Sequence, residues 1–129
     1  MRPIVLLLLL LPIAGCVDAL QDAAHPPGEM DAAGRIYPCH GWESDKQLCG
    51  DSKFFAKALT NVTIGQTKDL VRSIMKRDPW RREASAESGS LVERWGYPTS
   101  YEDERMAWIT FRDGAVVKLS ESSWEAGDK

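Results

Sequence analysis

Residues 105–119 read RMAWITFRDGAVVKL, a stretch in which apolar and β-branched side chains flank the dipeptide Asp113-Gly114. An Asp-Gly pair between two such runs is typical of a tight turn joining antiparallel strands. The stretch therefore predicts a β-hairpin with strands over residues 105–111 and 115–119.

Two turn lengths fit this hairpin, and they bury different residues. A two-residue turn pairs Ile109 with Lys118 and mixes apolar and charged side chains on both faces. A three-residue loop over 112–114 pairs Ile109 with Val117 and gathers the apolar side chains on one face. We favour the three-residue loop, which places Trp108 on the opposite, solvent-facing side of the sheet.

Upstream of the hairpin, the pattern predicts one further strand over Leu91 to Tyr97, ended by Pro98, and two helices. The first helix spans residues 53–59 behind Asp51 or Ser52 as N-cap. The second begins after Thr67 and stops before Asp78-Pro79, with an apolar stripe of Leu70, Val71, Ile74 and Met75. The segment from Trp80 to Gly89 is polar and low in β propensity, so it predicts no strand.

The amino terminus predicts export. Arg2 precedes an apolar run over residues 4–11 that is too short to span a bilayer, which is typical of a signal peptide. Ile13-Ala14-Gly15-Cys16 resembles the bacterial lipobox, which implies removal of residues 1–15 and lipidation of Cys16. The alternative is cleavage near Val17-Asp18-Ala19 and secretion without lipid. In the lipoproteins that this motif resembles, an aspartate directly after the cysteine favours retention in the inner membrane. Here that position is Val17, so the resemblance implies an anchor in the outer membrane, on its periplasmic face.

Residues 16–35 contain few large apolar side chains and predict a flexible tether with a reach of about 25 Å. A folded domain over residues 36–126 follows. Removal of Arg2 leaves 15 basic against 19 acidic residues, a balance that argues against nucleic acid as a partner.

Two cysteines remain in the predicted domain, Cys39 and Cys49. In an oxidising compartment they predict a disulfide that closes a loop of about 11 residues and stabilises the fold by roughly 2 to 3 kcal/mol. The competing interpretation is a metal site formed by both cysteines with His40 and Asp51, although no second closely spaced ligand pair accompanies them.

A family resemblance adds to this interpretation. The segment 64–71, the helix before Pro79, Glu93-Arg94-Trp95-Gly96-Tyr97 and the segment 109–117 together resemble the SmpA/OmlA domain, over about residues 60 to 120. That family includes the small lipoprotein subunit of the outer-membrane β-barrel assembly machine. The resemblance implies an α+β fold with two short helices packed on a three-stranded antiparallel sheet, in agreement with the periodicity. The chain departs from the family at Gln66 and Asp78, where methionine and glycine are common.

The sequence favours a binding module over an enzyme. Its two histidines, His25 and His40, form no apparent catalytic arrangement, and the acidic run of residues 102–104 is typical of a solvated loop. We expect no cofactor, metal or small-molecule substrate.

The expected partner is an outer-membrane protein or the barrel-assembly machinery, which the module would bind and stabilise. The alternatives are a structural or envelope-stress lipoprotein and a small inhibitor-like binding domain. Aromatic and arginine side chains dominate interface energetics, so the candidate contacts are Trp108, Trp95, Tyr97, Arg94 and Arg112. The alternative for Trp95 and Tyr97 is that they pack in the core or cover a sheet edge.

Overall fold

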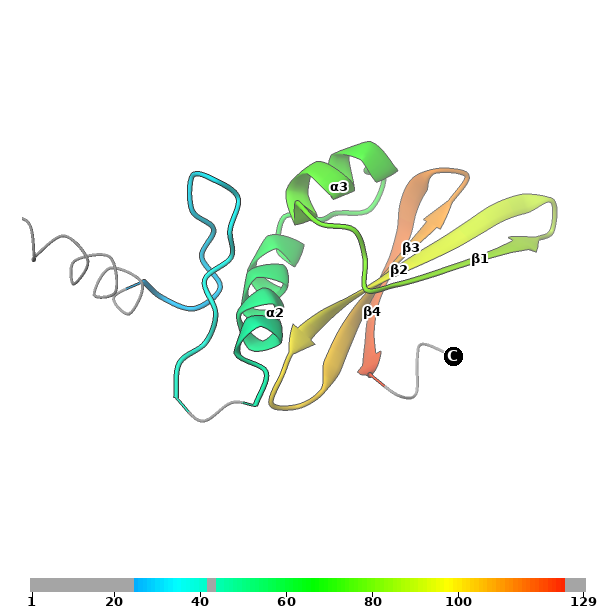
Figure 1. The fold of residues 1–129 in the computed structure, drawn as a ribbon. Helices are drawn as coiled ribbons and strands as arrows, with labels where there is room; N and C mark the ends of the chain where they lie inside the picture. Colours follow the sequence, from blue (N-terminus) through cyan, green and yellow to red (C-terminus); the bar gives the residue numbers. More distant parts are fainter. Residues whose placement is uncertain (1–24, 42–43, 125–129) are drawn as a thin grey trace, which may run out of the picture.

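A computed structural model describes residues 25–41 and 44–124, and its ribbon is shown in Figure 1. The predicted leader, Cys16 and the last residues of the predicted domain lie outside this range. Within the described residues, two helices and four strands follow one another. Among the described residues, no helix has both the length and the apolar character needed to cross a bilayer.

Helix α2 spans Lys46–Leu59 and is longer than the sequence predicts. Its N-cap is Asp45, whose carboxylate accepts a hydrogen bond from the Leu48 backbone N–H at 3.0 Å. The predicted caps Asp51 and Ser52 are wrong, because both lie inside this helix. Glycine has a low helix propensity, so Gly50 explains why the sequence pattern did not predict the first two turns of α2.

Helix α3 spans Lys68–Met75 and begins where the sequence predicts. Thr67 is the N-cap and accepts from the Leu70 N–H, while Asp69 lies in the first turn, near the positive end of the helix dipole. Lys76 ends the helix in the left-handed conformation. Val71 and Met75 point into the core and are fully buried.

The sheet is antiparallel with the order β1-β2-β3-β4, so the predicted three strands are too few. The strands are β1 (Arg81–Glu87), β2 (Ser90–Ser100), β3 (Arg105–Arg112) and β4 (Ala115–Ser123). Strand β1 forms because Ser88 and Gly89, both at positive φ, make a two-residue turn that pairs Glu87 with Ser90. Pro98 does not end β2: it pairs with Met106, and the register shifts just after it.

The β3–β4 hairpin corrects the predicted three-residue loop. Asp113 and Gly114, both at positive φ, form a two-residue turn that pairs Arg112 with Ala115 and Phe111 with Val116. A bulge at Val117 then shifts the register by one residue. Because of this bulge, Ile109 faces Leu119 instead of Lys118. The apolar pairs on the two sides of the bulge, Phe111 with Val116 and Ile109 with Leu119, therefore direct their side chains to the same face.

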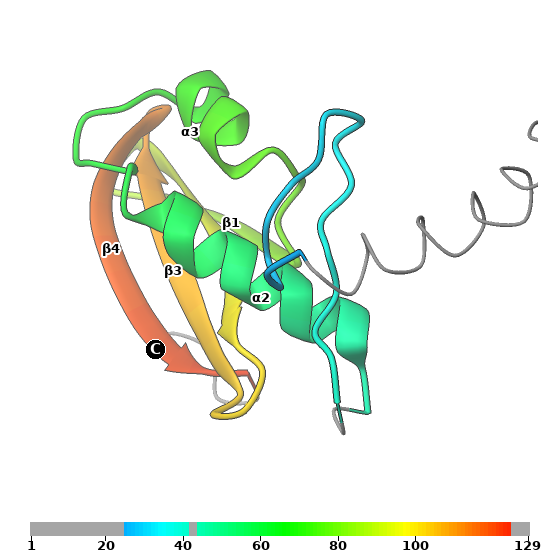
Figure 2. The ribbon, with the colours of Figure 1, turned by 90° about the vertical axis from the view of Figure 1, so that its left-hand side faces the viewer.

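Both helices cover the same face of the sheet, as Figure 2 shows for α2 crossing it. The α+β class with two helices on an antiparallel sheet is therefore confirmed. The core between the layers contains Phe55, Ala58, Val62, Val71, Met75, Trp95, Tyr97, Ile109, Phe111 and Val116.

Residues 26–37 belong to the folded domain. The Gly28 N–H donates to the Tyr37 carbonyl at 2.9 Å and the Tyr37 N–H to the Glu29 carbonyl at 2.8 Å, which closes a small loop. This loop packs on α2 so closely that a side chain at Gly50 would collide with the Tyr37 carbonyl. The predicted tether through residue 35 is thus too long, because backbone hydrogen bonds and glycine contacts hold this segment without many apolar side chains.

Candidate interaction surface

The structure places the two predicted aromatic contact residues of β2 in the core. Trp95 is 2% exposed and Tyr97 is fully buried. The Tyr97 hydroxyl donates to the Arg77 carbonyl at 2.8 Å, and burial raises the pKa of this phenol to about 12. Both rings therefore stabilise the helix-to-sheet packing and are inaccessible to a partner.

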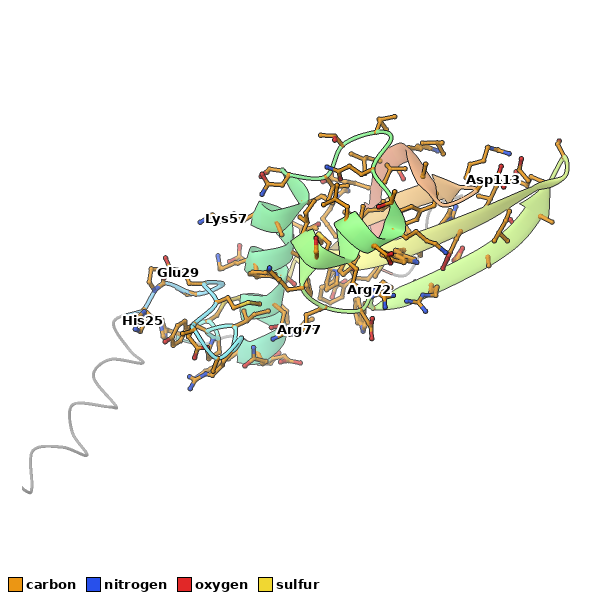
Figure 3. The ribbon with its side chains drawn as sticks, turned by 90° about the horizontal axis from the view of Figure 1, so that it is seen from above. His25, Glu29, Lys57, Arg72, Arg77 and Asp113 are labelled. Carbon is orange, nitrogen blue, oxygen red and sulfur yellow. A yellow bond between two sulfur atoms is a disulfide. The ribbon has the colours of Figure 1, made fainter. Side chains whose placement is uncertain are left out.

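Charged side chains enclose the Trp95 ring. The guanidinium carbons of Arg72 on α3 and Arg82 on β1 lie 5.3 and 5.4 Å from its centroid, and Arg72 is labelled in Figure 3. The indole N–H donates to Glu93 at 3.0 Å, and Lys68 donates to the same carboxylate at 2.9 Å. The Lys68 hydrogen bond is the main reason why the pKa of Glu93 lies below its ordinary value.

Trp108 is also fully buried, so the exposure predicted for it is wrong. It lies on the sheet face opposite the helices, where its indole N–H donates to the Ser122 hydroxyl at 2.9 Å. The Arg94 guanidinium covers the ring at 4.8 Å from the centroid and donates to Glu83 at 2.7 Å. A side chain at Gly96 would lie 2.7 Å from the Met106 sulfur and 3.1 Å from the Trp108 ring, so this glycine lets the indole lie flat on the sheet.

The two predicted arginines therefore differ in accessibility. Arg94 is largely occupied by Trp108 and Glu83, and its side chain is 22% exposed. Arg112 is exposed at the end of β3, next to the Asp113-Gly114 turn. The structure does not bring the five predicted contact residues together on one accessible surface.

A different set of aromatic rings does reach the surface, and we call it the aromatic cluster: Trp80, Tyr101 and Trp124. The rings of Trp80 and Trp124 meet edge to face with centroids 5.2 Å apart, and Tyr101 lies 6.1 Å from Trp124. Trp80 is 48% exposed, and the other two rings are partly exposed. Three segments that are distant in the sequence thus form one aromatic surface.

Backbone and polar contacts hold each ring of the cluster in place. The Trp80 N–H donates to the Gly96 carbonyl at 2.8 Å, which fixes the chain as it enters β1. The Trp124 backbone N–H donates to the Glu104 carbonyl at 2.8 Å, and its indole N–H donates to the Arg105 carbonyl at 2.7 Å. The Tyr101 hydroxyl accepts from the Asp45 N–H at 3.0 Å, next to the α2 N-terminus. The cluster is preorganised, so binding would order few side chains.

A groove of about 360 Å³ adjoins the cluster at Trp80. Its apolar wall includes Leu48, Phe55 and Pro98, and its polar residues are Asp51, Arg77 and Asp78. We call it the Trp80 groove. An apolar wall with a few charged groups suits a side chain of a protein partner, where the apolar part supplies affinity and the charges supply orientation.

The sequence pattern did not indicate this surface. Trp80 opens a segment that is otherwise polar, and Trp124 follows the polar run Ser120-Glu121-Ser122-Ser123. A tryptophan beside a polar segment has few apolar neighbours in the sequence. This isolation was the one sequence feature that could have indicated an exposed ring. The cluster could not be assembled in advance, because the strand that starts beside Trp80 was not predicted.

The disulfide between Cys39 and Cys49 is confirmed, with the two Cα atoms 5.7 Å apart. Both sulfurs are bonded to each other and are not available as thiolate ligands. The His40 ring contacts the His25 carbonyl at 3.3 Å, and within residues 25–41 and 44–124 no three His, Cys, Asp or Glu side chains are placed to hold a metal ion. Comparison of the chain with protein-family models, with curated proteins and with solved structures found no match in any of the three.

Proposed function

We propose that this chain is a lipid-anchored periplasmic interaction module that binds and stabilises an outer-membrane protein or the β-barrel assembly machinery. The observation that carries the proposal is the preorganised aromatic cluster beside the Trp80 groove. The lipobox-like Ile13-Ala14-Gly15-Cys16 supports the anchor. The Cys39–Cys49 disulfide fits an oxidising compartment.

The chemistry of the surface suits a folded protein partner. Tryptophan and tyrosine are enriched among the residues that contribute most to binding, and they act best when surrounding contacts exclude water. Trp80 presents its exposed half to a partner while Trp124 supports it from the side. Arg81, whose guanidinium carbon lies 5.9 Å from the Trp80 centroid, adds a charge at the rim.

Site-specific photocrosslinking in living cells tests the proposal. A photoreactive amino acid replaces Trp80 in the full chain, and a matched variant carries it at Leu91, which is similarly exposed near the other end of β2. We expect position 80, and not position 91, to capture an outer-membrane protein or a component of its assembly machinery. Equal capture at both positions would contradict the role of the cluster. No capture at position 80, with a normal outer-membrane protein profile in a deletion strain, would overturn the proposed function.

A further inference from the structure

The two edges of the sheet differ in their protection. Residues 65–68 cover the start of β4, where the Gly65 N–H donates to the Val116 carbonyl and the Val116 N–H to the Gln66 carbonyl, both at 2.8 Å. The bulge at Val117 interrupts that edge further. Strand β1, by contrast, has an exposed residue at every position, and no described segment pairs with its outer side.

Two features that discourage edge pairing, a proline and a bulge, are absent from strand β1, and its charged residues limit which strand can pair with it. Its sequence, RREASAE, contains no proline, and its pairing with β2 is regular from Arg81 to Glu87. Three consecutive small side chains follow Glu83, at Ala84, Ser85 and Ala86. The β1–β2 hairpin extends away from the helices in Figures 1 and 3, so another strand can approach it. An edge of this kind is a template for a further strand.

The turn determines which backbone groups point outward. In a hairpin with a two-residue turn, the residues flanking the turn exchange hydrogen bonds, and alternate pairs follow. Glu87 therefore bonds toward β2, while the backbone groups of Arg82, Ala84 and Ala86 face the open edge. Leu91, opposite Ala86, agrees with this phase because its N–H and carbonyl bond to Asp113 on the other side, at 3.0 and 2.9 Å.

The charges of β1 select a partner. If a second copy of β1 lies antiparallel to the first and the symmetry axis passes through Ala84, Arg81 of each copy faces Glu87 of the other. The residues whose backbone groups face the open edge then form hydrogen-bonded pairs, Arg82 with Ala86 and Ala84 with Ala84 of the second copy. A shift of one pair in either direction places Glu83 opposite Glu83 or opposite Glu87, and like charges directly opposite are unfavourable. The register centred on Ala84 alone overlaps all of β1 and joins opposite charges.

We propose that two copies of this chain pair edge to edge through β1, antiparallel and centred on Ala84, so that their sheets become continuous. The two helix layers then lie on the same side of the joined sheet. This pairing shares only Arg81 with the proposed partner surface and needs no barrel-assembly partner, so the register test at Ala84 is independent of the proposed function.

Cysteine crosslinking of the purified full chain tests the register. Two cysteines introduced by Ala84→Cys would face each other with Cα atoms about 5.5 Å apart, within the range of a disulfide. The matched control is Ala86→Cys, which alters another exposed alanine on the same face. Its two copies would lie about 13 Å apart along the strands. We expect a covalent dimer from Ala84→Cys only. A monomer from Ala84→Cys, or equal crosslinking of both variants, would overturn the proposal.

Charge reversal tests the complementarity by a separate route. Arg81→Glu and Glu87→Arg each place like charges opposite each other at two symmetric positions, so each should weaken dimerisation about tenfold in sedimentation equilibrium. The double variant restores both pairs and should return the dissociation constant to that of the original chain. Unchanged unfolding midpoints would show that the monomer fold is intact. Single reversals without effect, or a double variant as weak as the singles, would refute the charge pairing.

Discussion

Trp108 is the largest of the fully buried side chains in the described domain. It is fully buried on the sheet face that carries no helix, between Arg94, Gly96 and Ser122. Trp108→Ala should therefore lower the free energy of unfolding by about 3 to 5 kcal/mol, because it leaves a large cavity. Trp108→Phe should cost less, since it keeps most of the ring. Urea denaturation measures both variants.

Trp80→Ala is the matched control for that measurement. Half of this ring is already exposed, so its removal should change the free energy of unfolding by no more than about 1 kcal/mol. Similar losses for Trp80→Ala and Trp108→Ala would contradict the burial assigned to the two rings.

Glu93 makes the fold sensitive to acid. The Lys68 hydrogen bond holds the pKa of Glu93 below its ordinary value in the folded chain. The ionised carboxylate therefore stabilises the fold above the pKa of the unfolded chain, about 4.3. That stabilisation is lost as the pH falls through the lower pKa of the folded chain.

Glu93→Gln should accordingly reduce stability at neutral pH and make little difference in acid, below the folded-chain pKa. Thermal unfolding from pH 7 to pH 3 measures this convergence. Lys68→Met removes the main cause of the shift and should produce the same convergence. If the difference in unfolding temperature between the original chain and Glu93→Gln stays constant across this pH range, the ionised Glu93 carboxylate does not stabilise the fold in the way assigned to it.

At the level of elements, the disulfide joins two parts of the domain. It ties the loop that ends at Cys39 to the first turn of α2 at Cys49, where both sulfurs are buried. Replacing both cysteines by serine should cost about 3 kcal/mol in the chain-entropy model. Amide exchange should accelerate first in residues 26–40 because, apart from the disulfide, buried apolar packing in this segment is limited to Ile36 and Tyr37. Uniform acceleration across the sheet would contradict this local role.

The elements that sequence predicted correctly are those with local signals. Thr67 caps α3 by its own side chain, and the pair Cys39 and Cys49 stood alone within the predicted domain. Strand β1 was missed because its residues are all exposed and carry no alternating apolar pattern; pairing with β2 holds it. The predicted β3–β4 register was wrong because it was drawn from regular strand pairing. The bulge at Val117 lets a two-residue turn coexist with one apolar face, which regular pairing does not allow.

The candidate site was less predictable than the fold, for a related reason. Aromatic residues in apolar strands, such as Trp95 and Trp108, pack inside, whereas Trp80 and Trp124 lie where polar segments meet the domain. Their proximity depends on β1 running back along β2 and on β4 continuing to Ser123. The prediction lacked β1 and ended β4 at residue 119, so no sequence pattern could place the Trp80 and Trp124 rings next to each other.

At the scale of the whole molecule, an anchor at Cys16 would limit where the domain can bind. The described fold begins at His25, nine positions after Cys16. At about 3.3 to 3.6 Å per residue, even an extended segment of this length spans only about 30 Å. Since residues 26–37 are packed on α2, they add no reach. The proposed module would therefore stay close to the outer membrane, where barrel proteins are assembled.

The mature protein offers a direct test of this arrangement. We expect its mass to correspond to a chain that begins at an acylated Cys16 and contains the Cys39–Cys49 disulfide, and we expect the protein in the membrane fraction. Cys16→Ala should remove the acyl mass and release the chain from that fraction, and we expect the unfolding midpoint of the domain to stay unchanged. A mature chain that begins after Ala19 and carries no lipid would overturn the anchor, and the aromatic cluster would then have to act in the soluble periplasm.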